Sequence, residues 1–356
     1  MSSVRPNVSI VIKALNEERH IAVAIESAMA ALERMRGEVM RGEIMGEIIL
    51  ADSASTDRTV EIAANYPIKI VTLRNPGDRS CGTGVQLAYQ YSTGDFVCLI
   101  DGDMALHKEF LPAAIEFLVS NPQFAGVGGL IVERETENVE YVKRARDQGS
   151  DLLPGEVTRL DCGGVYRRAA IQTVRYLGDR NLHGSEELEL GARLRAQGWK
   201  LARIPVEAID HHGHSGNAYA LLRRRWTSRF AFSTGEILRG TFGTPAFPLV
   251  LRKLRWELFL YAAVQAWWLC LIATPFLAGS FVTAAAAVTA LALIPFLTMA
   301  LRCRSLNIGI YSVTAWNVYA AGLWPGLLRR RVDPTTQIES VVIRDAAVSE
   351  QAVHAA

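Results

Sequence analysis

The feature that most constrains this chain is an uncharged apolar stretch near its C-terminus, from residue 258 to residue 301. It divides at Gly279-Ser280 into two segments, 258–279 and 280–301, each long enough at ~1.5 Å per residue to cross ~30 Å of hydrocarbon. The short connection predicts a transmembrane helical hairpin, and the alternative is a buried helix pair in a soluble core. The positive-inside rule places both ends in the cytoplasm, because basic residues flank the stretch on both sides: Arg252, Lys253, Arg255, Arg302 and Arg304.

Two neighbouring apolar segments, 241–254 and 308–328, are expected to lie in the membrane interface as helices. A crossing by 308–328 would carry the arginines at 329–331 to the far side of the membrane, against the same rule. We therefore expect a membrane-associated region over 236–331 and a C-terminal tail over 332–356.

The bulk composition bounds the remaining part of the chain. A formal net charge of +2 does not indicate a nucleic-acid binder. The five cysteines are scattered without a CxxC pair, which fits a reducing compartment and argues against a disulfide framework or a zinc site. The N-terminus has no apolar core with a small-residue cleavage site, so no secretory signal is predicted. We expect residues 1–235 to form a cytosolic domain.

Short apolar runs alternate with helix-period segments in the first part of the chain. The expected strands are 8–14, 47–52, 68–73 and 95–101, and the expected helices are 17–39, 57–66, 82–92 and 106–120. This alternation predicts an α/β fold with a mainly parallel sheet and helices on both faces. In such sheets ligands bind beyond the carboxyl ends of the strands.

Acidic residues follow three of the expected strands. Glu17 follows the first strand, Asp52 ends the second, and Asp101 and Asp103 flank a glycine at the end of the fourth. Asp and Gly are ordinary turn residues, so a plain turn is one explanation of the last pair. The other is a divalent cation, Mg²⁺ or Mn²⁺, held by carboxylates together with the phosphates of a ligand.

Four segments in this order resemble the inverting glycosyltransferases of family 2, which have the Rossmann-like GT-A fold: "SIVIKALNEERHI", "EIILADSASTDRT", "GDFVCLIDGDM" and "EELELGARLRAQGW". The resemblance covers roughly residues 7–226. The hairpin and "NPGDR" at 75–79 further resemble membrane-associated bacterial enzymes of exopolysaccharide synthesis, of the succinoglycan type. The resemblance implies an enzyme at the bacterial inner membrane, with its catalytic domain facing the cytoplasm and a nucleotide-sugar donor.

The resemblance also implies roles for the acidic residues at the strand ends. The family's Pro-x-Tyr-Asn-Glu segment, which contacts the nucleotide, stands here without its Pro and Tyr, as Ala14, Leu15, Asn16 and Glu17. Asp52 matches the acid that binds the base or ribose. Asp101 and Asp103 match the DxD motif, in which the first Asp faces the sugar or ribose and the second binds the metal.

Further positions match the catalytic and acceptor segments of the family. "GSEELEL" at 184–190 aligns with Glu-Asp-x-Asp-Leu and places Glu187 at the catalytic base, with Glu in place of Asp. The alternative is an acidic first helical turn, which is our interpretation of Glu189 because it precedes Arg193 by four residues. Gly163 and Gly164 match the glycine-containing loop beside the acceptor.

The last two matches are weaker in sequence. "LLRRRW" at 221–226 resembles the QxxRW motif of processive synthases with its Gln replaced, which implies a diphosphate contact for Arg225 and an acceptor contact for Trp226. "DHHGHSG" at 210–216 offers a third metal ligand or a phosphate contact, with His212 as the predicted residue, against the alternative of a solvated loop histidine.

The expected function is metal-dependent, inverting transfer of a sugar to a hydroxyl of a polyprenyl-linked glycan, in cell-surface or exopolysaccharide synthesis. Two membrane crossings are few for an enzyme that also threads a polymer through the bilayer, so single-sugar addition is favoured. The alternatives are a processive polysaccharide synthase and a catalytically inactive protein that binds nucleotide sugars and acts in assembly.

Overall fold

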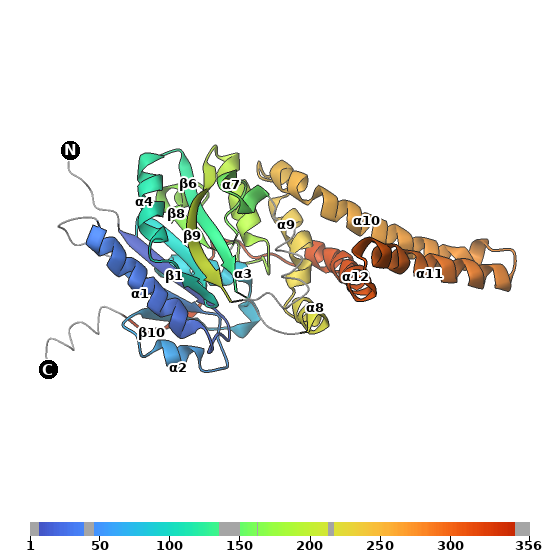
Figure 1. Ribbon diagram of the computed structural model, residues 1–356, viewed down its shortest axis with the longest axis horizontal. Helices are drawn as coiled ribbons and strands as arrows, with labels where there is room; N and C mark the ends of the chain where they lie inside the picture. The colour runs from blue at the N-terminus through green and yellow to red at the C-terminus, as the bar shows by residue number, and fades with distance from the viewer. Residues whose placement is uncertain (1–6, 39–45, 135–149, 162, 213–216, 346–356) are drawn as a thin grey trace. The chain divides into compact units, whose positions relative to one another are not determined.

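The computed structural model describes residues 7–38, 46–134, 150–161, 163–212 and 217–345, and these form two compact units (Figure 1). The first unit contains the described residues up to 212 together with 331–345, and the second contains 217–330. The expected division after residue 235 differs from this one. The helices at 218–227 and 233–241 pack against the helix at 306–328 and so belong to the second unit.

The first unit is built on a mixed sheet in which four adjacent strands are parallel. In spatial order these are β3 (Lys69–Leu73), β2 (Gly46–Asp52), β1 (Val8–Ala14) and β4 (Phe96–Asp101). The strand predictions are confirmed to within one residue at each end. The sheet continues through β5 (Met104–Leu106), β6 (Phe124–Glu133), β7 (Gly155–Val157), β8 (Gly164–Arg167) and β9 (Lys200–His211).

Helices cover both faces of the sheet, which confirms the predicted α/β class. On β1, Ile10 and Ile12 join a core with α1 (Ile21–Glu38), α2 (Thr59–Ala63) and α4 (Phe110–Ser120). Val11 points the other way, because successive strand residues alternate, and joins a second core. That core includes residues of α3 (Cys81–Tyr91), α6 (Arg168–Thr173) and α7 (Glu186–Ala196). Burial on both faces explains why the parallel strands are continuously apolar.

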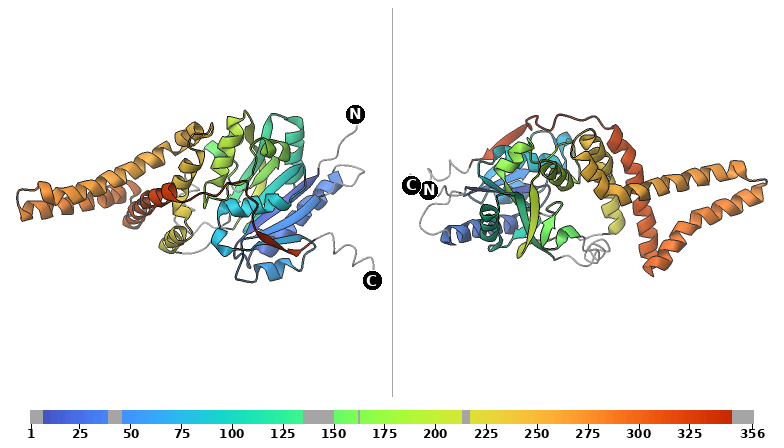
Figure 2. Two further views of the ribbon diagram at one scale, coloured as in Figure 1. Left: turned by 180° about the vertical axis from the view of Figure 1, so that it is seen from behind. Right: turned by 90° about the horizontal axis from the view of Figure 1, so that it is seen from above.

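The C-terminal segment 331–344 belongs to the first unit, where the sequence indicates only a tail. Its strand β10 (Ser340–Arg344) pairs antiparallel with β3 at the edge of the sheet (Figure 2). Before β10, Ile338 is buried, and its backbone N–H and C=O bond to the amide of Gln90 at 3.0 and 3.2 Å. The segment therefore returns to the first unit and forms one edge strand of its sheet.

Where it enters the first unit, this segment is fixed to the loop that precedes α7. The guanidinium of Arg331 bonds to the carboxylate of Asp179, whose side chain is 1% exposed. Asn181 holds the next residue, because its amide bonds to both the N–H and the C=O of Val332 at 2.8 Å. The loop before α7 is thus held by residues far away in sequence.

Replacing Arg331 with alanine is expected to destabilise the protein by about 3 kcal/mol, because it leaves the buried Asp179 carboxylate without its cation. The measurement is urea or thermal unfolding of the full chain in detergent. Arg330, which is exposed, is the control, and Arg330→Ala should leave stability almost unchanged. Equal effects of the two substitutions would contradict this account of the ion pair.

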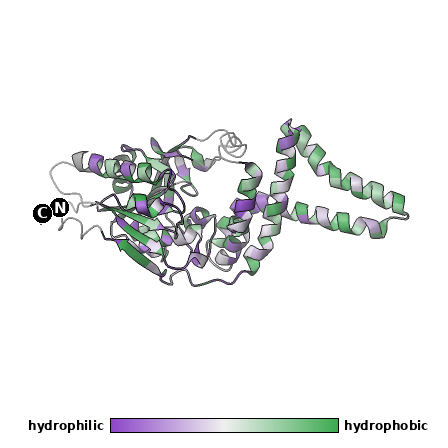
Figure 3. Cartoon of the chain, turned by 90° about the horizontal axis from the view of Figure 1, so that it is seen from below, coloured by the Kyte–Doolittle hydropathy of each residue, from purple (hydrophilic) through white to green (hydrophobic). Residues whose placement is uncertain are grey.

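The second unit is helical within its described residues. It consists of the 3₁₀ turn at Phe230–Phe232 and α8 (Ala218–Thr227), α9 (Ser233–Thr241), α10 (Phe247–Leu277), α11 (Phe281–Cys303) and α12 (Leu306–Leu328). By length and composition, α10 and α11 are able to cross a membrane. Figure 3 shows green, the hydrophobic colour, along much of these two helices, interrupted by paler and purple segments. The segment 241–254 is not a separate interfacial helix, because α10 starts at Phe247 and runs on without a break.

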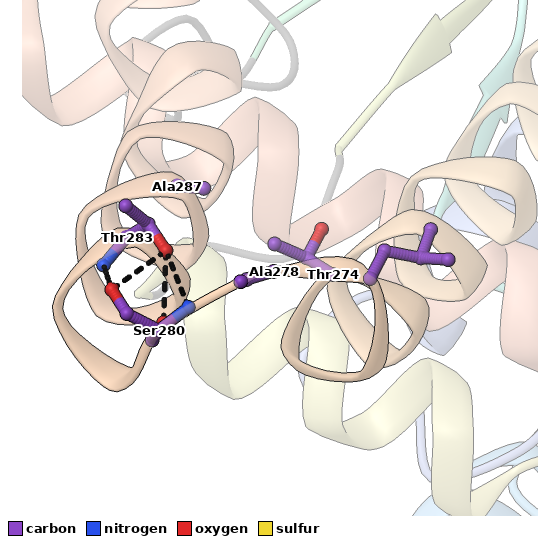
Figure 4. Close-up of a pocket in the computed structure, with 7 residues that line it drawn as sticks. Thr274, Ala278, Ser280, Thr283 and Ala287 are labelled. Atoms are coloured by element: carbon purple, nitrogen blue, oxygen red, sulfur yellow. Dashed lines mark hydrogen bonds between the residues drawn. The ribbon is translucent and has the colours of Figure 1, made fainter.

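The turn between α10 and α11 lies where the hairpin was predicted to divide. The Ser280 hydroxyl accepts the Thr283 N–H at 3.2 Å, and the Thr283 hydroxyl accepts the Ser280 N–H at 3.1 Å (Figure 4). This capping box starts α11. A hollow at the turn is lined by small and apolar residues and carries no charged side chain, so it lacks the groups that a diphosphate requires.

Candidate active site

The Asp-Gly-Asp turn at the end of β4 lies against the end of β1. Lys13 is level with Asp101 in the parallel register, and its C=O accepts the Gly102 N–H at 2.9 Å. A Cβ added to Gly102 would lie 2.9 Å from Cγ of Glu17, so glycine lets the two segments approach. The structure therefore brings Glu17 next to the predicted DxD motif.

The second carboxylate of the turn, Asp103, faces the end of β9. Its Oδ2 lies 3.6 Å from Nε2 of His211, and Nδ1 of His211 lies 2.6 Å from a carboxylate oxygen of Glu133. His211 and Asp103 are both largely buried. A carboxylate on one ring nitrogen fixes the tautomer and aims the other nitrogen, which is the usual arrangement of a metal-binding histidine.

His212, the predicted third ligand, is placed differently. Its N–H donates to the C=O of Asp103 at 2.9 Å, and its ring stacks on His20 with centroids 5.5 Å apart. Sequence reasoning missed His211, although it closes an apolar-polar strand and precedes His212 directly. Adjacent residues of an extended chain point in opposite directions, so only one of the two rings can face Asp103 in this way.

The Asp103 carboxylate is the kind of oxygen donor that Mg²⁺ and Mn²⁺ prefer, and the His211 imidazole places a nitrogen donor beside it. Across the described ranges, no three His, Cys, Asp or Glu side chains are grouped as a complete cation site. A cation bound here would need further oxygen ligands. In enzymes that act on phosphate-containing substrates, the substrate phosphates usually supply them.

Asp52 lies at the same sheet edge, paired in register with Ala14. Its carboxylate accepts the Ser55 N–H at 3.1 Å and the Thr72 hydroxyl at 2.6 Å, and the residue is 1% exposed. These bonds shape the turn after β2. Leu15 is partly exposed beside this turn.

Glu187 lies in the first turn of α7. The preceding residue, Glu186, bonds to Lys13 with Nζ and Oε1 3.0 Å apart, and Lys13 Nζ lies 3.3 Å from Oδ1 of Asp101. Burial raises the pKa of Glu187 well above its usual value, and the nearby Asp161 and Glu186 raise it further. A carboxylate with a raised pKa is a stronger base, as general base catalysis near neutral pH requires.

The predicted structural role of Glu189 is confirmed. Its carboxylate bonds to Arg193 at 2.6 Å, four residues further along the helix. The Arg193 guanidinium also lies 3.7 Å from the ring centroid of Tyr176 and donates to backbone C=O groups before α7. Glu189 thus serves to anchor the helix that carries Glu187.

The glycine pair predicted to lie beside the acceptor is close to the end of β4. Gly163 has φ +89°, and a Cβ there would lie 2.7 Å from the C=O of Leu99. Gly164 begins β8 and pairs with Leu99. Both glycines therefore lie beside Leu99 of β4, two residues before Asp101.

Arg225 and Trp226 belong to α8 in the second unit. Arg225 donates to the Tyr319 hydroxyl at 2.7 Å and lies 5.3 Å from the Phe230 ring centroid. Trp226 packs edge-on against Phe232 and is 40% exposed. Their contacts with substrate remain predictions.

Glu187→Gln is expected to stabilise the protein in a pH-dependent way. The pKa of Glu187 is higher in the folded protein than in the unfolded chain, where it is about 4.3. Its stabilising contribution is therefore fully present below the unfolded pKa and is lost as pH rises through the folded pKa. Glutamine stays neutral, so the Tm of Glu187→Gln should exceed that of the wild type increasingly above about pH 4.5 and then level off. Thermal unfolding from about pH 4 to about pH 9 measures this, and a difference independent of pH would contradict it.

Comparison with known proteins identifies the family of the domain and its fold. Residues 9–175 match the family described as Glycosyl transferase family 2. A stretch of 127 residues is 35% identical to the low-salt glycan biosynthesis hexosyltransferase Agl6 of Haloferax volcanii and covers 36% of this chain and 28% of that protein. Another is 32% identical over 127 residues to the undecaprenyl-phosphate 4-deoxy-4-formamido-L-arabinose transferase of Pectobacterium carotovorum, covering 34% of this chain and 36% of that protein.

These matches span less than two thirds of the length of either relative. Among solved structures, the mannosyltransferase PcManGT of Pyrobaculum calidifontis, in complex with GDP-Man and Mn²⁺, superposes with a TM-score of 0.59. It is 16% identical, and the match covers 92% of this chain and 88% of that one, which establishes a shared fold. Residues 9–175 of this chain therefore form a family 2 glycosyltransferase domain, and the fold is GT-A.

Proposed function

We propose that this protein transfers a sugar from a nucleotide-sugar donor to a hydroxyl of a polyprenyl-linked glycan, with inversion at the anomeric carbon. One observation carries the proposal: Lys13 joins the Asp-Gly-Asp turn to the helix of Glu187, at the carboxyl edge of a family 2 sheet. The metal-binding candidates and the base candidate are thereby parts of one site.

Asp103 and His211 are the residues that would hold Mg²⁺ or Mn²⁺. The fit of their donor atoms and the support of His211 by Glu133 favour this assignment over His212. When bound, the cation would supply positive charge for the departing diphosphate. The presence of Mn²⁺ with GDP-Man in a protein of the same fold is consistent with it.

Glu187 is the proposed general base. Its carboxylate takes the proton of the acceptor hydroxyl as that oxygen forms a bond to the anomeric carbon. The bond from the anomeric carbon to the diphosphate oxygen breaks on the opposite face, and its electrons leave with the nucleotide diphosphate. One such displacement inverts the configuration, so an α-linked donor would give a β-linked product.

The remaining predicted residues are assigned to donor and acceptor. Ala14, Leu15, Glu17, Asp52 and Asp101, which lie at the sheet edge, would contact the base, ribose or sugar, and Asp101 is oriented by Lys13. Gly163 and Gly164 would border the acceptor. For Arg225 and Trp226, which belong to the second unit, the resemblance implies a diphosphate contact through the planar guanidinium and an acceptor contact, respectively.

A lipid-linked acceptor is supported by the second unit. Two of its helices are long and apolar enough to cross a membrane, and a relative acts on undecaprenyl phosphate according to its name. The basic residues that flank the apolar stretch favour an inner-membrane hairpin with the catalytic unit on the cytoplasmic side. We place α12, which contains 308–328, in the membrane interface.

A nucleotide-sugar screen tests the proposal. The full chain in detergent is heated with each donor, with and without Mn²⁺ or Mg²⁺, and donors that raise the Tm are then offered with polyprenyl-linked glycans. A single added sugar with inverted configuration supports the proposal, and NMR of the product reports the linkage. Long products would instead indicate a processive synthase. Binding without transfer or donor hydrolysis would indicate an inactive assembly protein.

A further inference from the structure

Lys13 is a charged residue of the site to which the family resemblance assigns no role. It lies near the end of β1, opposite Asp101 in the parallel register. Its Nζ is 3.3 Å from Oδ1 of Asp101 and 3.0 Å from Oε1 of Glu186. Its C=O also accepts the Gly102 N–H. One residue therefore contacts the DxD turn by backbone and side chain, and α7 by side chain.

The position is unusual for a lysine. It follows the apolar run of a central strand, and by its spacing it stands where the Pro-x-Tyr-Asn-Glu segment has its uncharged proline. The side chain is only 17% exposed. Burial by itself disfavours the ammonium, but the two carboxylates more than offset this and raise the pKa of Lys13 above its usual value. Lys13 is therefore a fixed positive charge.

The surroundings of Glu187 show why such a charge matters. Three acids interact electrostatically with Glu187: Asp101 of β4, Asp161 before β8 and Glu186 of α7. Two cations also do so, Lys13 of β1 and Arg159 before β8. The remaining groups are Tyr166 of β8 and Cys81 of α3. Arg159 is bonded to Asp161 at 2.6 Å. Lys13 lies between the other two acids, Asp101 and Glu186.

We propose that Lys13 is a positioning residue for the transfer reaction, whose ammonium holds Asp101 and Glu186 together and so sets the location and charge environment of Glu187. This inference rests on the proposed function. Without the ammonium, two partly buried carboxylates would face each other unpaired, and their repulsion would move the donor side and the base side of the site apart.

The test compares Lys13→Met, which keeps the length of the side chain, with Lys13→Arg, which keeps the charge. Lys200→Met is the matched control, because Lys200 forms an exposed ion pair with Glu156 in the same unit. Two readouts are used on the full chain in detergent. The first is kcat and KM for the donor found in the screen. The second is labelling of Glu187 by a water-soluble carbodiimide from about pH 4 to about pH 9, followed by mass spectrometry, which reports the protonated carboxyl without any turnover.

For Lys13→Met we expect kcat to fall at least about tenfold, and the midpoint of Glu187 labelling to move up by about one pH unit. Lys13→Arg should restore most of both values, and Lys200→Met should resemble the wild type. An unchanged kcat and midpoint in Lys13→Met would overturn the inference. So would a loss of Tm with an unmoved midpoint, since that would show a purely structural role. If neither the wild type nor any variant transfers sugar but the midpoint moves, the proposed function fails, while the effect of Lys13 on the charge environment of Glu187 stands.

Discussion

Glu187→Gln is expected to lower kcat by about 10²- to 10⁴-fold while nucleotide-sugar binding stays nearly intact. Glutamine has almost the same shape as glutamate, but it cannot take the proton of the acceptor hydroxyl. The first turn of α7 and its contacts with Lys13 through Glu186 would be preserved. The measurements are transfer kinetics with the donor found in the screen, and calorimetric titration of that donor with Mn²⁺ present.

Glu189→Gln is the matched control, because Glu189 lies in the same acidic first turn and is paired with Arg193. This substitution should lower stability but leave most of the kcat of the folded protein. If Glu187→Gln kept wild-type turnover, or if the two substitutions lowered kcat equally, the acidic turn would be structural and Glu187 would not be the base.

Asp103→Ala is expected to remove metal-dependent donor binding. The substitution removes the carboxylate that faces His211, which is a proposed ligand of the cation that binds the diphosphate. The loss should amount to several kcal/mol, which corresponds to an increase of about 10² or more in the donor Kd with Mn²⁺ present. Calorimetry with and without Mn²⁺ measures it, because the wild type should respond to the metal and the variant should not.

Two comparisons sharpen this experiment. Asp95→Ala is the control, because Asp95 is exposed just before the opposite end of β4. His211→Ala and His212→Ala separate the two histidine assignments. If His211 is the ligand, its substitution should reproduce most of the loss of the metal response, whereas His212→Ala should keep that response. Metal-dependent binding retained in Asp103→Ala would remove this residue from the cation site.

The site could be predicted from the sequence where its residues are local to strand ends. Apolar runs such as β1 and β4 have few alternatives to a buried strand, and the polar residue that ends each run marks the carboxyl edge. The local pattern therefore suffices to assign Glu17 and Asp101 to one edge. The Glu189–Arg193 pair was predictable for a similar reason, because helical spacing brings residues four apart together.

The features that the sequence did not predict have a common cause, which is dependence on long-range pairing. The choice between His211 and His212 depends on which way β9 faces, and this is decided by its pairing with β5 and β6. The strand β10 is short and its sequence is unremarkable, so only the free edge of β3 makes it a strand. Lys13 looks like a residue that merely ends a strand until Glu186, 173 positions away in sequence, is placed beside it.

The sequence alone determined the α/β class, the family, the apolar helical hairpin and the acids at the strand ends, because these follow from local hydrophobic period and short motifs. Only the tertiary structure decided which histidine faces Asp103, which cation joins Asp101 to the helix of the proposed base, and that the C-terminal segment returns to the loop before that helix. These are contacts between residues distant in sequence. They are determined by strand register, side-chain direction and the pairing of buried charges, and none of these can be derived from a local pattern.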